Sequence, residues 1–132
     1  MSMAPQILVV DDSTAIREVF RMVLTDEGYE VTLCSGPDEA VAEIERSKPD
    51  LIILDWIFGM EYLGMPMIEW LKEEPATADI PVLVCSAAPD HIQEAETYLK
   101  SKGVGIVYKP FELDGLLSAV ASALGSVGQG DG

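Results

Sequence analysis

The chain has 132 residues, of which 48% are hydrophobic and 23% charged, and its formal net charge is −15. This length suits one domain and is enough to bury a core without disulfides or a structural metal. The acidic balance offers no basic stripe, so we expect no nucleic-acid binding through this domain. The apolar runs are far shorter than the roughly 20 residues that span a bilayer. There is also no signal-peptide pattern, so we expect a cytoplasmic protein without a membrane partner.

Short apolar strands alternate with helical stretches along the chain. The expected strands are 7–10, 30–34, 50–54, 81–85 and 104–108, and the expected helices are about 14–27, 37–48, 65–73, 89–102 and 112–124. Apolar residues recur at intervals of three and four in the helices, whereas the strands are almost continuously apolar. Gly28 suits the C-terminal cap of the first helix, and Pro37 suits the first turn of the second. Arg17 and Arg21 are expected to pair with nearby acids on the first helix.

Five repeated strand–helix units predict an α/β fold. Units of this length form a parallel sheet with helices on both faces and right-handed crossovers, a flavodoxin-like doubly wound (βα)5 arrangement with strand order 2-1-3-4-5. In that order Cys34 and Cys85 lie three strand positions, or roughly 14 Å, apart, too far for a disulfide. We expect the domain to cover 1–124 and a Gly-rich flexible tail to cover 125–132.

Polar residues stand at the ends of four of these strands: Asp11 and Asp12, Asp55, Ser86, and Lys109. In an open parallel sheet, ligands bind in the crevice at the carboxyl ends of the strands. The fold would therefore bring three carboxylates, a hydroxyl and an ammonium to one pocket. Such a set suits a divalent cation and a phosphoryl group.

The three acids carry most of this inference. Two carboxylates about 4 Å apart repel by roughly 4 kcal/mol at an effective dielectric of 20, so a cluster of them recruits a cation or a proton. A site with only a few oxygen ligands from the protein favours Mg²⁺, whose remaining coordination positions are filled by water and by phosphate oxygen. Taken singly, Asp11 and Asp12 could cap a helix, Ser86 could do the same, and Lys109 could be solvated. Their joint occurrence at the strand ends favours the site.

With these motifs the chain resembles the receiver domain of the response-regulator family of two-component signalling, over Gln6 to Leu124. The resemblance is carried by Val-Val-Asp11-Asp12, Leu-Ile-Ile-Leu-Asp55, Val-Leu-Val-Cys-Ser86-Ala87 and Lys109-Pro110-Phe111. It implies a phosphorylation-dependent switch rather than an enzyme with its own substrate. The phosphoryl donor would be a histidine kinase or a histidine phosphotransfer protein, and the output would be a downstream protein target that the sequence does not name.

The resemblance also implies individual roles at the site. Asp55 would be the phosphoacceptor, and Mg²⁺ would be bound by Asp12, Asp55 and the backbone carbonyl of Ile57, with Asp11 acting through water. Lys109 would neutralise phosphate charge, and its bond to Pro110 would be cis. The phosphate-binding and switch set would be completed by three more residues, Ser86, Ala87 and Ile106.

The chain departs from the family pattern at two places. The loop over 56–64 lacks the usual proline, and Ile106 stands where an aromatic switch residue is usual. These departures favour an alternative, a receiver-fold interaction module that works without phosphorylation. A third possibility is a phosphohydrolase of haloacid-dehalogenase type, which also uses an aspartate nucleophile at a strand end. The spacing Asp11-Asp12-Ser13-Thr14 and the absence of room for a cap domain argue against it.

Overall fold

The computed structural model describes residues 4–56, 64–86, 92–108 and 112–128. Along the chain the elements are β1 Gln6–Val10, α1 Thr14–Asp26, β2 Glu30–Cys34, α2 Pro37–Ser47, β3 Leu51–Asp55, α3 Gly64–Glu73, β4 Val82–Ser86, η1 Gln93–Ala95, α5 Glu96–Ser101, β5 Gly105–Tyr108 and α6 Leu113–Gly128. The strand and helix positions predicted from periodicity are therefore confirmed over most of the chain.

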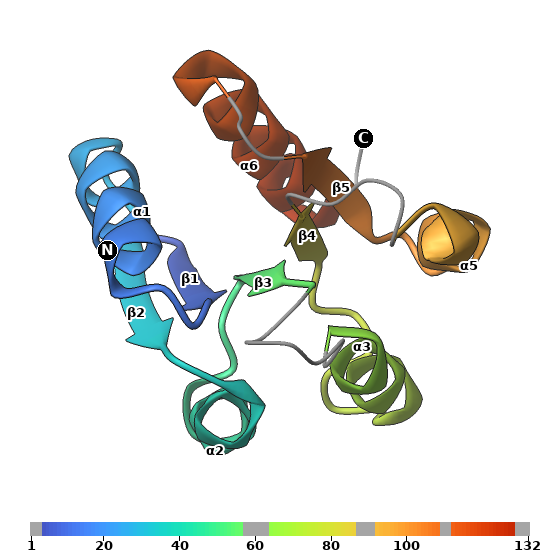
Figure 1. Ribbon diagram of the computed structural model, residues 1–132. Helices are drawn as coiled ribbons and strands as arrows, with labels where there is room; N and C mark the ends of the chain where they lie inside the picture. Colours follow the sequence, from blue (N-terminus) through green and yellow to red (C-terminus); the bar gives the residue numbers. More distant parts are fainter. Residues whose placement is uncertain (1–3, 57–63, 87–91, 109–111, 129–132) are drawn as a thin grey trace.

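The strands form one parallel sheet in the order β2-β1-β3-β4-β5, as predicted. Figure 1 shows α1 and α6 on one face of the sheet and α2, α3 and α5 on the other. The central strands β1 and β3 are buried along nearly their whole length because helices cover both of their faces. This explains why their sequences are continuously apolar rather than alternating.

Each face of the sheet has its own core cluster. On one face, Phe20 and Leu24 of α1 pack with Leu116 and Val120 of α6 against the sheet. On the other face, the apolar sides of α2, α3 and α5 cover the strands, with buried residues such as Ile68. Side chains of this size contribute roughly 1.5–3 kcal/mol each when fully buried. The two clusters hold the sheet rigid and so fix where its carboxyl edge lies.

Local sequence determines where the first helices begin and end. Ser13 is the N-cap of α1, and its Oγ accepts a hydrogen bond from the N–H of Ile16 at 3.2 Å. The helix ends at Asp26 with Glu27 as its C-cap, and Gly28 follows with a φ of +94°, a conformation that glycine adopts without the cost other residues carry. Pro37 opens α2 directly after its N-cap, as predicted.

The structure differs from the predicted elements at two places in the C-terminal half of the chain. The stretch expected to be one helix over 89–102 contains a 3₁₀ turn at Gln93–Ala95, followed by the short α5. The described part of this stretch is thus helical as predicted, with tighter 3₁₀ geometry at these three residues, and its expected start at Pro89 lies outside the described residues. The last helix continues to Gly128, so it overlaps the tail predicted over 125–132.

Cys34 and Cys85 are both buried and form no disulfide with each other, as their strand positions predicted. Across the described ranges, no helix combines the length and the apolar character needed to cross a membrane.

Candidate functional site

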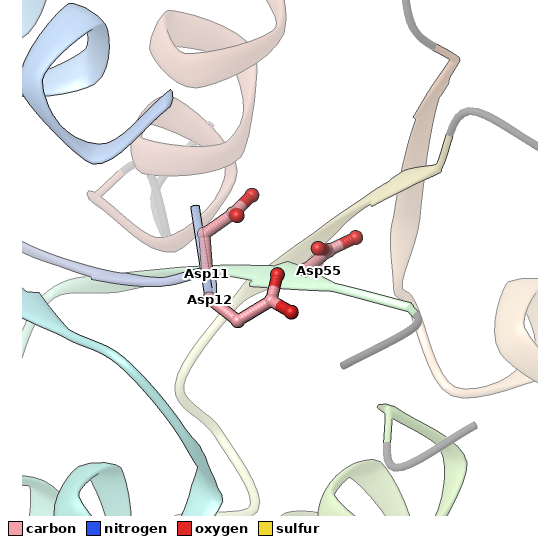
Figure 2. Close-up of side chains that lie close together, drawn as sticks. All are labelled: Asp11, Asp12 and Asp55. Atoms are coloured by element: carbon pink, nitrogen blue, oxygen red, sulfur yellow. The ribbon is translucent and has the colours of Figure 1, made fainter. Parts of the chain in front are cut away.

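The carboxyl ends of β1 and β3 bring three aspartates together. The two strands are neighbours in register, with Val10 opposite Leu54, so the residues that follow them meet at the same edge of the sheet. Carboxylate oxygens of Asp11, Asp12 and Asp55 all lie within 4.8 Å of one another. Figure 2 shows Asp11 and Asp12 at the end of β1 and Asp55 at the end of β3. The structure thus confirms that these three acids form one cluster.

Asp11 is the most buried of the three, with 2% of its surface exposed. Its backbone N–H donates to the carbonyl of Cys34 on β2 at 3.1 Å. Its Oδ1 accepts the N–H of Ser13 at 2.9 Å, and its carbonyl accepts a hydrogen bond from Arg17 Nη1 at 2.6 Å. The backbone and side chain of Asp11 are therefore held by three separate partners.

These contacts decide between the two sequence interpretations of the acid pair. The capping interpretation would have placed Asp11 or Asp12 at the N-cap of α1, but Ser13 occupies that position. The side chain of Asp11 instead forms a local turn with the backbone two residues on, which is a typical aspartate conformation. Neither acid is therefore the N-cap of α1, and both belong to the cluster with Asp55.

Burial falls from one side of the cluster to the other. Asp11 is buried, Asp55 is half-buried, and Asp12 is exposed, so the cluster opens to solvent on the side of Asp12. At 4.8 Å, each pair of carboxylates repels by about 1 kcal/mol in water and about 3.5 kcal/mol at an effective dielectric of 20. A divalent cation would replace this repulsion with attraction, and oxygen-only ligands match the preference of Mg²⁺. The donor set therefore fits that ion.

Trp56 anchors the chain directly after Asp55. The residue is 3% exposed, and its backbone N–H donates to the carbonyl of Cys85 at 3.2 Å. Its own carbonyl accepts the N–H of Gly64, at the start of α3, at 3.1 Å. A Cβ at Gly64 would lie 2.9 Å from the Trp56 ring and 3.0 Å from its backbone, so only glycine fits there. These contacts tie α3 to the end of the strand that carries Asp55.

The remaining predicted site residues are only partly covered by the structure. Ser86 ends β4, and its backbone pairs with Tyr108 at the end of β5, on the same sheet edge as the acids. Ile106 lies in β5, partly buried against the core beneath α2, α3 and α5. The side chain of Ser86 and four further predicted residues, Ile57, Ala87, Lys109 and Pro110, lie outside the described residues. Their roles stay predictions.

Sequence reasoning missed the part that Ser13 and Arg17 play. Arg21 pairs with Glu18 at 2.6 Å, as predicted, but Arg17 donates to the backbone of Asp11 and to the Oγ1 of Thr14 at 3.2 Å. Arg17 thus does contact a nearby acid, but these two hydrogen bonds reach the backbone of Asp11 and a hydroxyl. The aspartate-x-serine spacing before a helix was a readable signal for the turn. No local pattern indicates an arginine that reaches back six residues to a carbonyl.

Together the doubly wound parallel sheet and the three carboxylates at its carboxyl edge define a class of α/β protein that presents an acidic site on rigid strand ends. The family model described as the response regulator receiver domain matches residues 7–121. The chain belongs to this family, as the resemblance had indicated.

Several characterised proteins are similar to the chain. The nitrogen assimilation regulatory protein NtrX of Azorhizobium caulinodans is 33% identical over 123 residues, which cover 92% of this chain and 26% of NtrX. The phosphate regulon transcriptional regulatory protein PhoB of Escherichia coli is 32% identical over 122 residues, which cover 92% of this chain and 52% of PhoB. The chain thus spans about half the length of PhoB and about a quarter of NtrX.

Among solved structures, the chemotaxis response regulator CheY4 of Vibrio cholerae superposes with a TM-score of 0.78 at 27% identity, covering 92% of this chain and 99% of CheY4. Receiver domains of this family act as phosphorylation-dependent switches and generally bind Mg²⁺ at an acidic pocket. They interact with histidine kinases and with downstream effectors.

Proposed function

We propose that Asp55 accepts a phosphoryl group from the phosphohistidine of a histidine kinase or a histidine phosphotransfer protein, and that Mg²⁺ assists the transfer. The observation that carries the proposal is the approach of the carboxylates of Asp11, Asp12 and Asp55 to within 4.8 Å. The family match adds support, because receiver domains act as switches of this kind.

Asp11 and Asp12 supply the negative charge that would hold the ion beside Asp55. Asp12 is exposed and would bind Mg²⁺ directly, whereas Asp11 is buried and anchored by its own hydrogen bonds. The ion would supply charge neutralisation for phosphoryl oxygens next to an acidic nucleophile. The backbone carbonyl of Ile57 completes the protein ligands in this proposal.

In the transfer itself, a carboxylate oxygen of Asp55 attacks phosphorus while the bond from phosphorus to the imidazole nitrogen breaks. With a proton on the other ring nitrogen of the phosphohistidine, the products are an acyl phosphate on Asp55 and a neutral imidazole on the donor. Apart from Asp55, no group of the chain forms a covalent bond in this step. The other groups contribute position and charge, as is usual in phosphoryl transfer. Asp55 is suited to this because it is half-buried at the end of a strand and because the next residue, Trp56, is buried in the core.

The second part of the proposal concerns the switch. Lys109 and Ser86 would contact the new phosphoryl oxygens, and the added charge would bias the surface that a downstream protein recognises. The pairing of the ends of β4 and β5 supports this, because it puts Ser86 and Tyr108, the residue before Lys109 in the sequence, on the edge that holds the acids. Ile106 in place of an aromatic residue predicts that the coupling passes through packing and not through the rotation of a ring.

Acetyl phosphate tests the proposal without a cognate kinase. The chain is incubated with acetyl phosphate and MgCl₂ and its intact mass is measured, with parallel samples in EDTA. We expect a single phosphoryl adduct that needs Mg²⁺ and is lost in Asp55→Asn. Asp26→Asn serves as the matched control, because Asp26 is an exposed acid at the end of α1, away from the cluster.

An adduct that survives in Asp55→Asn, or none in the unaltered chain, would overturn the proposal. The second result would favour the interaction module that works without phosphorylation, which the replacement of the aromatic switch residue by Ile106 also favours. An adduct that forms equally well in EDTA would remove the ion from the mechanism while keeping Asp55 as acceptor.

A further inference from the structure

Arg17 lies outside the acidic cluster but contacts the backbone of one of its members. It lies on α1, and its guanidinium bridges two points of the loop between β1 and the helix. Nη1 donates to the carbonyl oxygen of Asp11 at 2.6 Å, and Nη2 donates to the hydroxyl of Thr14 at 3.2 Å. Hydrogen bonds from a charged donor are shorter and stronger than neutral ones, and 2.6 Å is at the short end of the range.

The bonded carbonyl belongs to the peptide that joins Asp11 to Asp12. On the other side of Asp11, its N–H is held by the carbonyl of Cys34 at 3.1 Å, and its side chain is held by the N–H of Ser13. The hydrogen bond from Arg17 therefore restrains the one remaining backbone group of Asp11. Rotation of that peptide would swing the Cα of Asp12 and so move its exposed carboxylate relative to Asp55.

We propose that Arg17 is a positioning residue for metal binding: by holding the Asp11–Asp12 peptide, it keeps the Asp12 carboxylate within reach of an ion shared with Asp55. This inference rests on the proposed function only in taking Mg²⁺ as the ion. Arg17 touches neither the ion nor the phosphoryl group. It acts through the backbone of the residues that do.

A purely electrostatic role for Arg17 makes the opposite prediction. A guanidinium close to a cation site repels the cation, so removal of its charge should tighten Mg²⁺ binding. Loss of a positioning contact should weaken binding instead, by about tenfold in the dissociation constant, as is usual for groups that orient metal ligands. The direction of the change therefore separates the two roles.

Two substitutions and one control use this difference. Arg17→Gln removes the charge and the fork of donors, whereas Arg17→Lys keeps the charge but replaces the planar fork with a single ammonium. Arg21→Gln removes an equal charge one turn further along the same helix, where the partner is the side chain of Glu18. The dissociation constant for Mg²⁺ is obtained by titrating MgCl₂ and following the rise in melting temperature, with tryptophan fluorescence as a second readout.

We expect Mg²⁺ to bind about tenfold more weakly to Arg17→Gln and several-fold more weakly to Arg17→Lys. Arg21→Gln should bind it like the unaltered chain. Melting curves in EDTA show separately whether each variant is folded; if Arg17→Gln does not fold, Arg17→Lys decides alone.

Tighter binding to Arg17→Gln, or unchanged binding to Arg17→Lys, would overturn the positioning role while leaving the proposed function intact. Weakening of the same size in Arg21→Gln would also overturn it, because charge or helix stability would then suffice. If the unaltered chain shows no response to MgCl₂, the positioning role of Arg17 and the choice of ion are both overturned, whereas Asp55 as the phosphoacceptor is decided separately by the acetyl phosphate experiment.

Discussion

The acidic cluster predicts that Asp12→Asn makes the chain more stable when no divalent ion is present. Asp12 lies within 4.8 Å of two other carboxylates, those of Asp11 and Asp55, so the substitution removes two repulsive pairs. Because Asp12 is exposed, the value for water applies, about 1 kcal/mol for each pair. Lys109, the one cation predicted at this edge, would offset part of that repulsion. The net gain should be about 1–2 kcal/mol, or roughly 4–8 °C in melting temperature for a domain of this length.

The assay is thermal or urea unfolding in EDTA at low ionic strength, with Asp26→Asn as the control for loss of an exposed acid. The gain of Asp12→Asn should shrink in 1 M salt, because the screening length there is only about 3 Å. In MgCl₂ the order should reverse, since the unaltered chain gains binding free energy that the variant has lost. A variant that is less stable than the unaltered chain in EDTA would refute the reasoning, because it would show that Asp12 is held by favourable contacts that outweigh repulsion.

Two further predictions test the packing around the site. Gly64→Ala should destabilise the chain by roughly 1–3 kcal/mol in urea unfolding, because its Cβ meets the ring and backbone of Trp56, whereas Gly115→Ala on α6 has open space and should be neutral or stabilising. Equal effects of the two would contradict this. Burial, aided by nearby carboxylates, raises the pKa of the Cys34 thiol from 9.0 to about 11. The folded chain thus favours the protonated thiol, and its stability should fall between about pH 9 and pH 11. Cys34→Ala should lose less stability over that interval, and an equal loss in both would count against a raised pKa.

The candidate site was predictable to the extent that it follows from strand ends. Asp55 stands directly after a continuous apolar run, and Asp11 and Asp12 stand after another, so a parallel sheet had to bring them to one edge. The structure bears out this grouping within the residues it describes. Ser86 was likewise placed at the edge by its strand, although here it is the last residue of β4 and not the first residue after it.

Other features depended on contacts that no local pattern encodes. The spacing on α1 predicted that Arg17 and Arg21 pair with nearby acids, and the partner of Arg21 is Glu18 on the same helix. Arg17 reaches a backbone carbonyl on the preceding loop, six residues back along the chain. The requirement for glycine at 64 is of the same kind, because it arises from the packing of α3 on Trp56.

The amino-acid sequence by itself determined the strand and helix pattern, the parallel α/β class and the chemical identity of the acidic groups, because these depend on periodicity and on residues adjacent in the chain. Only the tertiary structure decided how those groups stand to one another: which acid is buried, which is exposed, and which arginine holds the peptide between Asp11 and Asp12. The physical reason is that distances and burial are set by the packing of helices on a sheet. Packing joins residues that are far apart along the chain.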